Sequence, residues 1–176
     1  VVVTTGASEA LAAAVLALVE AGDEVIVLEP YFDLYAAIIA MAGATRVAVP
    51  LAVPESGTGD GFTLDERALA KAITPRTRMI IVNSPHNPTG MVLSRDELEA
   101  IARIAIDNDL LVISDEAYEH LVFGGAKHVP IAALPGMFER SVTIGSGGKS
   151  FSFTGWKVGW ASGPTDLITA VRVVRQ

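Results

Sequence analysis

The chain has 176 residues, 51% hydrophobic and 19% charged, with 9 prolines and 16 glycines, a composition that excludes a disordered chain and favours one compact α/β domain. The formal net charge of −7 argues against nucleic acid and anionic membranes as partners, and the lack of cysteine excludes disulfides and Cys-based metal sites. The apolar runs are too short or interrupted to cross a membrane and no signal-peptide pattern opens the chain, so a cytoplasmic location is expected.

Short β-branched runs alternate with helical patterns along the whole chain. The predicted strands, in chain order, are 1–5, 25–28, 46–49, 79–83, 110–114, 142–145 and 157–161. The predicted helices are 8–20, 32–42, 65–73, 98–108 and 166 onward, and 50–61 is a predicted loop. This alternation predicts a doubly wound, mostly parallel α/β sheet of about seven strands with helices on both faces.

Local signals set the ends of several elements. The first strand, 1–5, reads as buried because it is apolar from its first residue. The helix at 8–20 is ended by Gly22, and Ser94 with Glu97 matches a capping box before the helix at 98–108.

Both ends of the chain look like cuts through a larger protein. The chain opens directly on an apolar strand pattern and closes, from Ile168 to Gln176, on an apolar-periodic stretch without a stop signal. It contains no internal repeat and no linker long enough for a second domain. We therefore expect residues 1–176 to be a single domain that is truncated at both ends.

Small and polar residues follow several of the predicted strands. Because the carboxyl ends of parallel strands meet at one edge of a sheet, where ligands collect, these residues are expected to converge. They are Gly6, Ala7, Ser8, Asn83, Asn87, Asp115, Ser146 and Lys149.

Lys149 is the most informative of these residues. It lies among serines and glycines just after the apolar run at 142–145. An ammonium in such a place is expected to lose hydration, which lowers the pKa of the lysine and makes its amine a usable nucleophile. Lys149 is therefore a candidate Schiff-base former.

The other candidates each have an ordinary structural alternative. Gly6-Ala7-Ser8 opens a helix, which makes either an anion site or a simple N-cap at Ser8. Asp115 follows an apolar strand and needs a partner, or its pKa rises; otherwise it is a turn aspartate. Asn83 and Asn87 are typical of turns as well as of binding sites.

Three motifs resemble the class I/II aminotransferases, which are fold-type-I enzymes that use pyridoxal 5′-phosphate (PLP). They are S-x-x-K-x-F-x-x-T-G-W-K-x-G-W at 146–160, N-x-P-H-N-P-T-G at 83–90 and S-D-E-x-Y at 114–118. The resemblance covers essentially the whole chain. It is closest to the branch of kynurenine, methionine and N-succinyldiaminopimelate aminotransferases, which the segments 118–123 and 135–137 suit.

The resemblance implies roles for three catalytic residues. Lys149 holds PLP as an internal aldimine, and its freed amine moves the Cα proton of the substrate. Asp115 pairs with the protonated pyridine nitrogen, which keeps the ring an electron sink. Tyr118 donates a hydrogen bond to the ring oxygen.

The resemblance also implies a set of cofactor contacts. Phe32 stacks on the ring, Asn87 contacts the ring oxygen and the substrate carboxylate, and Asn83 is more peripheral. The residues that match phosphate contacts are Gly6, Ala7, Ser8, Ser146 and Lys157. The residues His120, His128, Asp107, Asp109, Glu116 and Glu119 are not spaced like metal ligands, so no metal is expected. His86 is expected to be structural.

The function implied is amino-group transfer between an L-amino acid and a 2-oxo acid. A PLP-dependent C–S β-lyase and a non-enzymatic aminotransferase-like regulatory domain remain open, and a nucleotide-binding Rossmann module is a distant alternative. Residues 1–176 correspond to the PLP-binding large domain without the small domain, which supplies the substrate-carboxylate arginine in this family. The chain alone is therefore expected to be inactive, and the full-length protein to be a homodimer. Cis bonds are expected at Glu29–Pro30 and Asn87–Pro88.

Overall fold

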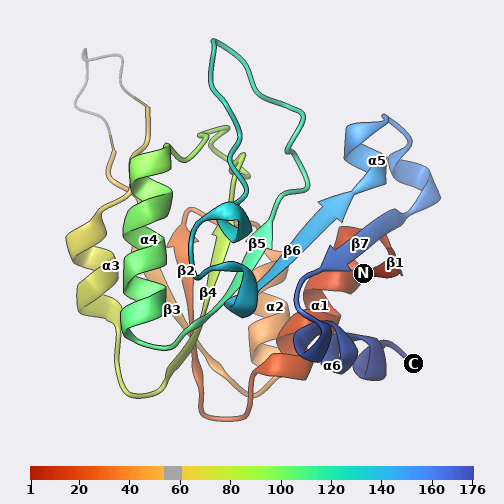
Figure 1. The fold of residues 1–176 in the computed structure, drawn as a ribbon, viewed down its shortest axis with the longest axis horizontal. Coiled ribbons are helices and arrows are strands. Elements are labelled where there is room, and N and C mark those ends of the chain that lie inside the picture. The colour runs from red at the N-terminus through yellow and green to blue at the C-terminus, as the bar shows by residue number, and fades with distance from the viewer. Residues whose placement is uncertain (54–60) are drawn as a thin grey trace.

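A computed structural model describes residues 1–53 and 61–176, and their seven strands form one sheet in the order β1-β7-β6-β5-β4-β2-β3 (Figure 1). The strands are β1 (Val2–Thr5), β2 (Glu24–Glu29), β3 (Thr45–Pro50), β4 (Thr77–Asn83), β5 (Leu111–Asp115), β6 (Ser141–Ser146) and β7 (Val158–Ser162). The helices are α1 (Gly6–Leu18), α2 (Leu34–Met41), α3 (Glu66–Ala72), α4 (Arg95–Asp107), α5 (Gly147–Ser150) and α6 (Thr165–Arg175). Three 3₁₀ turns are η1 (Ile131–Ala133), η2 (Phe138–Arg140) and η3 (Thr154–Trp156).

Two apolar layers cover the sheet, one on each face. Along β2, Val25 and Val27 pack with residues of α1, α2 and α6, whereas Ile26 and Leu28 pack with residues of α3, α4 and the turn η1. Alternate side chains of a strand point to opposite faces, so a strand that is apolar at every position is buried on both sides. The doubly wound α/β fold is thus confirmed, with parallel pairing throughout β2 to β6.

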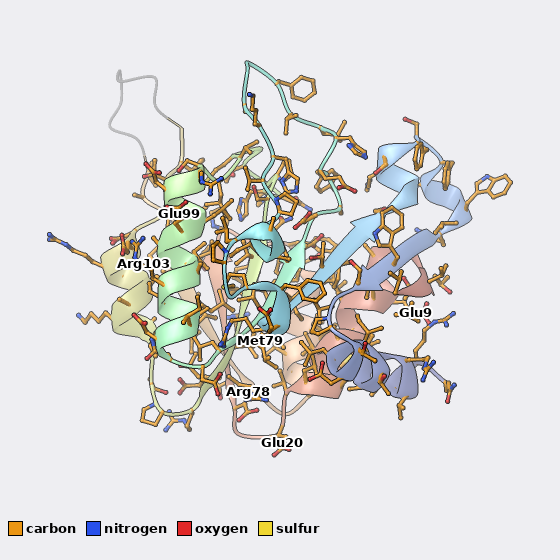
Figure 2. All side chains as sticks on the ribbon, viewed as in Figure 1. Glu9, Glu20, Arg78, Met79, Glu99 and Arg103 are labelled. Carbon is orange, nitrogen blue, oxygen red and sulfur yellow. The ribbon has the colours of Figure 1, made fainter. Side chains whose placement is uncertain are left out.

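The helix α4 shows how an exterior helix is held on this sheet. Its apolar side faces the sheet, while Glu99 and Arg103 lie on its outer side (Figure 2). Arg103 reaches Glu66 of α3 at 3.0 Å. The predicted capping box is present, because Ser94 Oγ accepts from the Glu97 amide and Glu97 Oε2 accepts from the Ser94 amide.

The direction of β7 decides where the candidate residues lie. β7 pairs antiparallel with both β1 and β6, so it is the one strand of the described sheet that runs against the other six. Its amino end therefore meets the carboxyl ends of its neighbours: Val158 pairs with Thr5, and Gly159 pairs with Ser146. The residue before β7, Lys157, is brought to the same edge as Gly6.

The structure corrects several sequence expectations. β1 is an edge strand with one buried face, because Val2 and Thr4 are buried whereas Val3 is 63% exposed. The first helix begins at Gly6, so Ser8 lies in its first turn and is not the N-cap. Lys157 is in the left-handed region, with a φ of 55°, and does not belong to the strand.

Other expectations concern single segments. The short helix α5, which carries Lys149, was not predicted. The expected loop at 50–61 lies largely outside the described residues. Cis bonds occur at Glu29–Pro30 and Asn87–Pro88 as expected, and also at Ser84–Pro85. Among the helices that are described, none combines the length and the apolar character that a bilayer span requires.

Candidate active site

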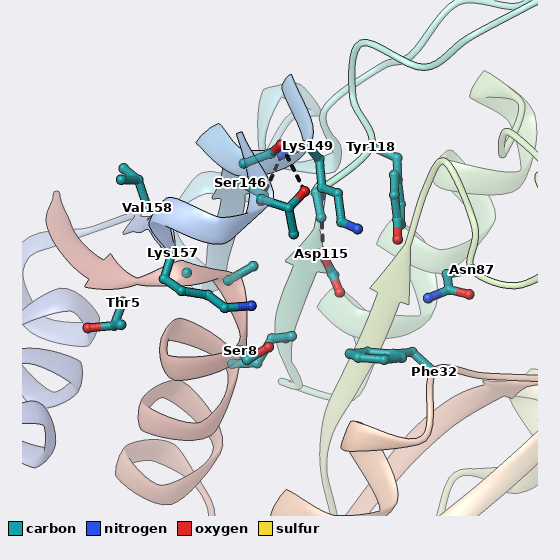
Figure 3. A pocket seen from close by; sticks show the side chains of 16 residues that line it. Thr5, Ser8, Phe32, Asn87, Asp115, Tyr118, Ser146, Lys149, Lys157 and Val158 are labelled. Atoms are coloured by element: carbon teal, nitrogen blue, oxygen red, sulfur yellow. Dashed lines mark hydrogen bonds between the residues drawn. The ribbon is translucent and has the colours of Figure 1, made fainter. Parts of the chain in front are cut away.

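A cavity of about 510 Å³ opens at the edge of the sheet where β1, β5 and β6 end, a size typical of small-molecule sites (Figure 3). It brings together ten of the eleven predicted site residues; Asn83 lies outside the lining. The predicted residues in the lining are Gly6, Ala7, Ser8, Phe32, Asn87, Asp115, Tyr118, Ser146, Lys149 and Lys157. The remaining lining residues are Thr5, Leu11, Ala117, Gly148, Thr154 and Val158.

One end of the cavity is suited to an anion. The first turn of α1 lines it with Gly6, Ala7 and Ser8, and backbone N–H groups at a helix N-terminus attract negative charge. The side chain of Thr5, the N-cap residue, makes no capping bond to them. Lys157 points toward the same end from the other side (Figure 3), and within the described residues it makes no ion pair.

The backbone at this end is closely packed. Gly6 has a φ of 80°, a left-handed conformation that favours glycine. Gly159 of β7 lies against the same turn: a Cβ at residue 159 would come 2.4 Å from the carbonyl carbon of Gly6 and 2.5 Å from the Ala7 nitrogen. The helix start is therefore held against the sheet by a residue without a side chain.

Lys149 enters the cavity from α5. Its amide donates to Ser146 Oγ at 3.3 Å, so Ser146 caps the short helix, and its Nζ lies 5.5 Å from the centroid of the Tyr118 ring. The lysine is exposed, so the expectation that it loses its hydration is wrong. The reason is that Lys149 stands on the short helix α5 at the rim of the cavity, directly after Gly147 and Gly148, which have no side chains to cover it.

Asp115 is the buried charge of the site, with 4% of its surface exposed. Its Oδ1 accepts a hydrogen bond from the Ala117 amide at 3.1 Å, and its Oδ2 accepts one from the Tyr35 hydroxyl at 2.6 Å. Burial raises the pKa of Asp115, whereas the hydrogen bonds from Tyr35 and Ala117 oppose the rise and the nearby charge of Glu116 adds to it. The expectation that a buried Asp115 needs hydrogen-bond partners is therefore confirmed, and the partners are Tyr35 and the Ala117 amide.

Tyr35 is the functional candidate that sequence reasoning missed. It is 1% exposed, and its ring meets that of Phe32 edge-on, with centroids 5.8 Å apart. One signal was available: Phe32 and Tyr35 are three residues apart within the predicted helix 32–42, a spacing that puts two side chains on one face. A polar tip on a buried face needs a partner, and the partner is Asp115.

The two asparagines have different positions. Asn87 lines the cavity, on the side away from Lys157 (Figure 3). Asn83 is 3% exposed and lies behind it: its side chain donates to the Asp115 carbonyl at 2.9 Å and accepts from the Asn87 amide at 2.7 Å. Asn83 therefore ties the backbones of two lining residues together.

Two histidines lie near the site but outside its lining. His86 is 5% exposed; Nδ1 of its ring lies 2.8 Å from Thr89 Oγ1, and burial lowers its pKa, which suits the structural role expected for it. His128 Nε2 lies 2.8 Å from Glu116 Oε2. Ligand atoms of Glu116, Glu119 and His128 lie within 4.8 Å of one another, because the segment after β5 folds back. The expectation that the protein holds no metal stays a prediction.

Comparison with known proteins agrees with this geometry. The family model for aminotransferase class I and II matches residues 1–176. The chain is 59% identical, over its full length, to a probable N-succinyldiaminopimelate aminotransferase of Mycobacterium tuberculosis and 49% identical to a kynurenine–oxoglutarate transaminase of Bos taurus. It spans 43% and 40% of the length of these two relatives.

A solved structure gives the same picture. The N-succinyldiaminopimelate aminotransferase structure from Mycobacterium tuberculosis superposes with a TM-score of 0.95 at 58% identity. The match covers 99% of this chain and 44% of that one.

Proposed function

The chain belongs to the class I and II aminotransferase family, and from that premise we propose that the full-length protein transfers an amino group between an L-amino acid and a 2-oxo acid, with PLP as cofactor. One observation carries the proposal. Asp115 ends β5, and Lys149 follows the neighbouring strand β6. The Lys149 side chain, the buried Asp115 carboxylate and the N-terminus of α1 all line one cavity.

The donor set of the cavity fits PLP. A phosphate needs cations and N–H donors, and the α1 start, Lys157 and Ser146 gather at one end. A pyridinium nitrogen needs an anionic acceptor, and Asp115 is a buried carboxylate with a raised pKa that a cation would relieve. An aromatic ring needs an apolar face, and Phe32 provides one.

When bound, PLP supplies an electron sink for the substrate carbon. The residues of this chain supply the rest. Gly6, Ala7, Ser8, Ser146 and Lys157 hold the phosphate.

The ring end of the cavity has its own set of residues. Phe32 covers the face of the ring, and Asn87 and Tyr118 contact its oxygen. Asp115 accepts the N–H of the ring nitrogen. Asn83 holds the backbone of Asp115 and Asn87 from behind.

Lys149 has two duties in this proposal. Its Nζ would be the point of covalent attachment for PLP, and as a free amine it would move the proton of the substrate Cα as general base and acid. The position over the Tyr118 ring, 5.5 Å from its centroid, gives the protonated amine a favourable contact while it holds that proton.

The organisation of the whole protein is part of the proposal. Residues 1–176 form the PLP-binding large domain, and a small domain supplies an arginine for the substrate carboxylate. Large apolar side chains exposed near the cavity fit this organisation; they are Phe123, Phe151 and Trp156. A homodimer and a cytoplasmic location stay predictions, which sedimentation and localisation of the tagged full-length protein would test.

The test is a half-reaction assay on the full-length protein. Loaded with PLP, it should convert an amino-acid donor into its oxo acid and then regenerate the starting form with 2-oxoglutarate. Donors of the first screen are N-succinyldiaminopimelate, kynurenine and methionine. Borohydride should fix the cofactor to Lys149. Release of pyruvate and ammonia from a β-substituted donor, without amino transfer, would make the protein a lyase; no cofactor uptake at all would refute PLP chemistry.

A further inference from the structure

Tyr35 is a buried tyrosine whose hydroxyl has one hydrogen-bond partner within residues 1–53 and 61–176, the carboxylate of Asp115. It lies on α2, 80 residues before Asp115, and it is enclosed by the apolar cluster between the sheet and α1, α2 and α6. The Tyr35 Oη–Asp115 Oδ2 distance of 2.6 Å is shorter than that of most neutral O–H···O hydrogen bonds, as is typical when the acceptor is charged. Burial and the adjacent Asp115 carboxylate raise the pKa of Tyr35 well above its usual value, so the tyrosine is the donor at every physiological pH.

Packing alone does not call for a hydroxyl at this place. A phenylalanine would fill the same space beside Phe32 and would carry no polar group to desolvate. The hydroxyl is therefore explained by what it bonds. That bond joins α2, which packs on the same face of the sheet as α1 and α6, to Asp115 at the end of β5.

The Asp115 carboxylate keeps free acceptor positions. An ionised carboxylate has about four lone-pair positions, and two are used here, by Tyr35 on Oδ2 and by the Ala117 amide on Oδ1. One donor lies on α2 and the other is the backbone amide two residues after Asp115, and each bonds a different carboxylate oxygen. Together they fix the plane of the carboxylate. The remaining positions are available to a group in the cavity that Asp115 lines.

We propose that Tyr35 is a positioning residue that acts through Asp115: its hydroxyl holds the carboxylate ionised and turned toward the cavity, where it accepts the N–H of the cofactor ring. The inference rests on the proposed function for its last step. The first step, the effect of Tyr35 on the ionisation of Asp115, is independent of the cofactor.

The variant Tyr35→Phe in the full-length protein removes the hydroxyl alone. In the cofactor-free protein, the carboxyl ¹³C signal of Asp115 should titrate at a higher pH than in the wild type, by about one pH unit. In the loaded protein, the dissociation constant for PLP should rise about tenfold, and the acid limb of the kcat profile should move to higher pH. Tyr31→Phe is the matched control, because that ring stacks under Arg46 at 5.2 Å and does not line the cavity; it should change neither value.

A double-mutant cycle separates positioning from general destabilisation. In the Asp115→Asn background, Tyr35→Phe should produce no further loss of PLP affinity, because the residue through which it acts is gone. Additive losses would overturn the proposal, as would an unchanged Asp115 titration in Tyr35→Phe. Failure of the wild type to take up PLP, together with a shifted Asp115 titration, would refute the proposed function and the last step while leaving the ionisation effect standing.

Discussion

Gly159 lies directly against Gly6, so that a β-carbon at residue 159 would stand 2.4 Å from the Gly6 carbonyl carbon. This contact joins the start of β7 to the turn that opens α1. Real β-carbons do not approach backbone atoms so closely, and the turn must move if a side chain is added. The anion end of the cavity therefore depends on a residue that does not itself line the cavity.

We predict that Gly159→Ala lowers both stability and phosphate affinity. Overpacking of this kind costs about 1–3 kcal/mol, and displacement of the Gly6–Ala7 peptide spoils the N–H donors of the helix start. Thermal unfolding and PLP titration of the full-length protein measure the two effects. Gly155→Ala is the control, since no atom lies within 4 Å of its added carbon. Wild-type PLP affinity in Gly159→Ala would show that the turn adjusts without cost.

The two lysines of the cavity should fail in different ways. Lys149→Ala should abolish borohydride-trapped PLP, whereas Lys157→Ala should keep the trapped adduct at Lys149 and raise the PLP dissociation constant about tenfold through loss of one charge-assisted contact. Mass spectrometry of tryptic peptides locates the adduct. Lys71→Ala, an exposed residue of α3, should match the wild type. An adduct on Lys157 in the wild type would reverse the assignment of the two lysines.

Asp115→Asn should stabilise the cofactor-free protein while removing activity. The pKa of Asp115 is raised by folding, so its charge costs stability at pH values above the folded pKa, and the cost disappears as the pH falls below the unfolded value near 3.8. Asparagine avoids that cost and can still bond Tyr35 and the Ala117 amide. We expect a gain of at least about 1 kcal/mol at pH 8 that shrinks toward pH 4. Denaturant unfolding at several pH values checks it; a loss at pH 8 would contradict it.

Glu24→Gln should destabilise the fold in a pH-dependent way. Glu24 begins β2 and accepts from Thr74 Oγ1 at 2.6 Å and from Arg76 Nη2 at 2.5 Å, and these hydrogen bonds lower its pKa. A lowered pKa gives stability that is present above the unfolded value near 4.5 and is lost as the pH falls through the folded one. At pH 7 the loss should be about 1–3 kcal/mol, and it should shrink below pH 4.

The control for this variant is a surface pair. Glu99→Gln breaks a contact with Arg95 of 2.8 Å on the exposed side of α4, and it should cost less than about 0.5 kcal/mol. Equal losses for the two variants would show that the buried position of Glu24 adds nothing.

The layered fold follows from patterns that are local in the sequence. Continuous apolar runs at β2, β4 and β5 predict strands buried on both faces, and the capping box predicts the start of α4. The direction of β7 is not local, because it depends on which neighbours are available at the sheet edge. For this reason β1 was expected to be buried and is an edge strand.

Much of the site could be predicted because the three sequence motifs contain several of its residues. Most of the expected residues line the cavity because they follow strands that end at one edge. Asn83, which was expected at a more peripheral position of the cofactor site, lies behind the lining, since it still belongs to β4 and its side chain bonds the Asp115 carbonyl. Tyr35 was missed because its partner is 80 residues away, and no pattern in one segment reveals the other.

The antiparallel pairing of β1 with β7 has a consequence for how the molecule folds. β1 has β7 as its only neighbour in the described sheet, and α1 packs against α6. The first strand and helix of residues 1–176 therefore cannot complete their packing until β7 and α6 are available. Gly6 and Lys157 are separated by about 150 residues along the chain. Closing so long a loop is entropically costly and slow, and strands β2 to β6 can pair before it happens. The anion end of the cavity, which is built from the start of α1 and from Lys157, therefore forms only once β7 has paired with β1, and we expect it to assemble after strands β2 to β6.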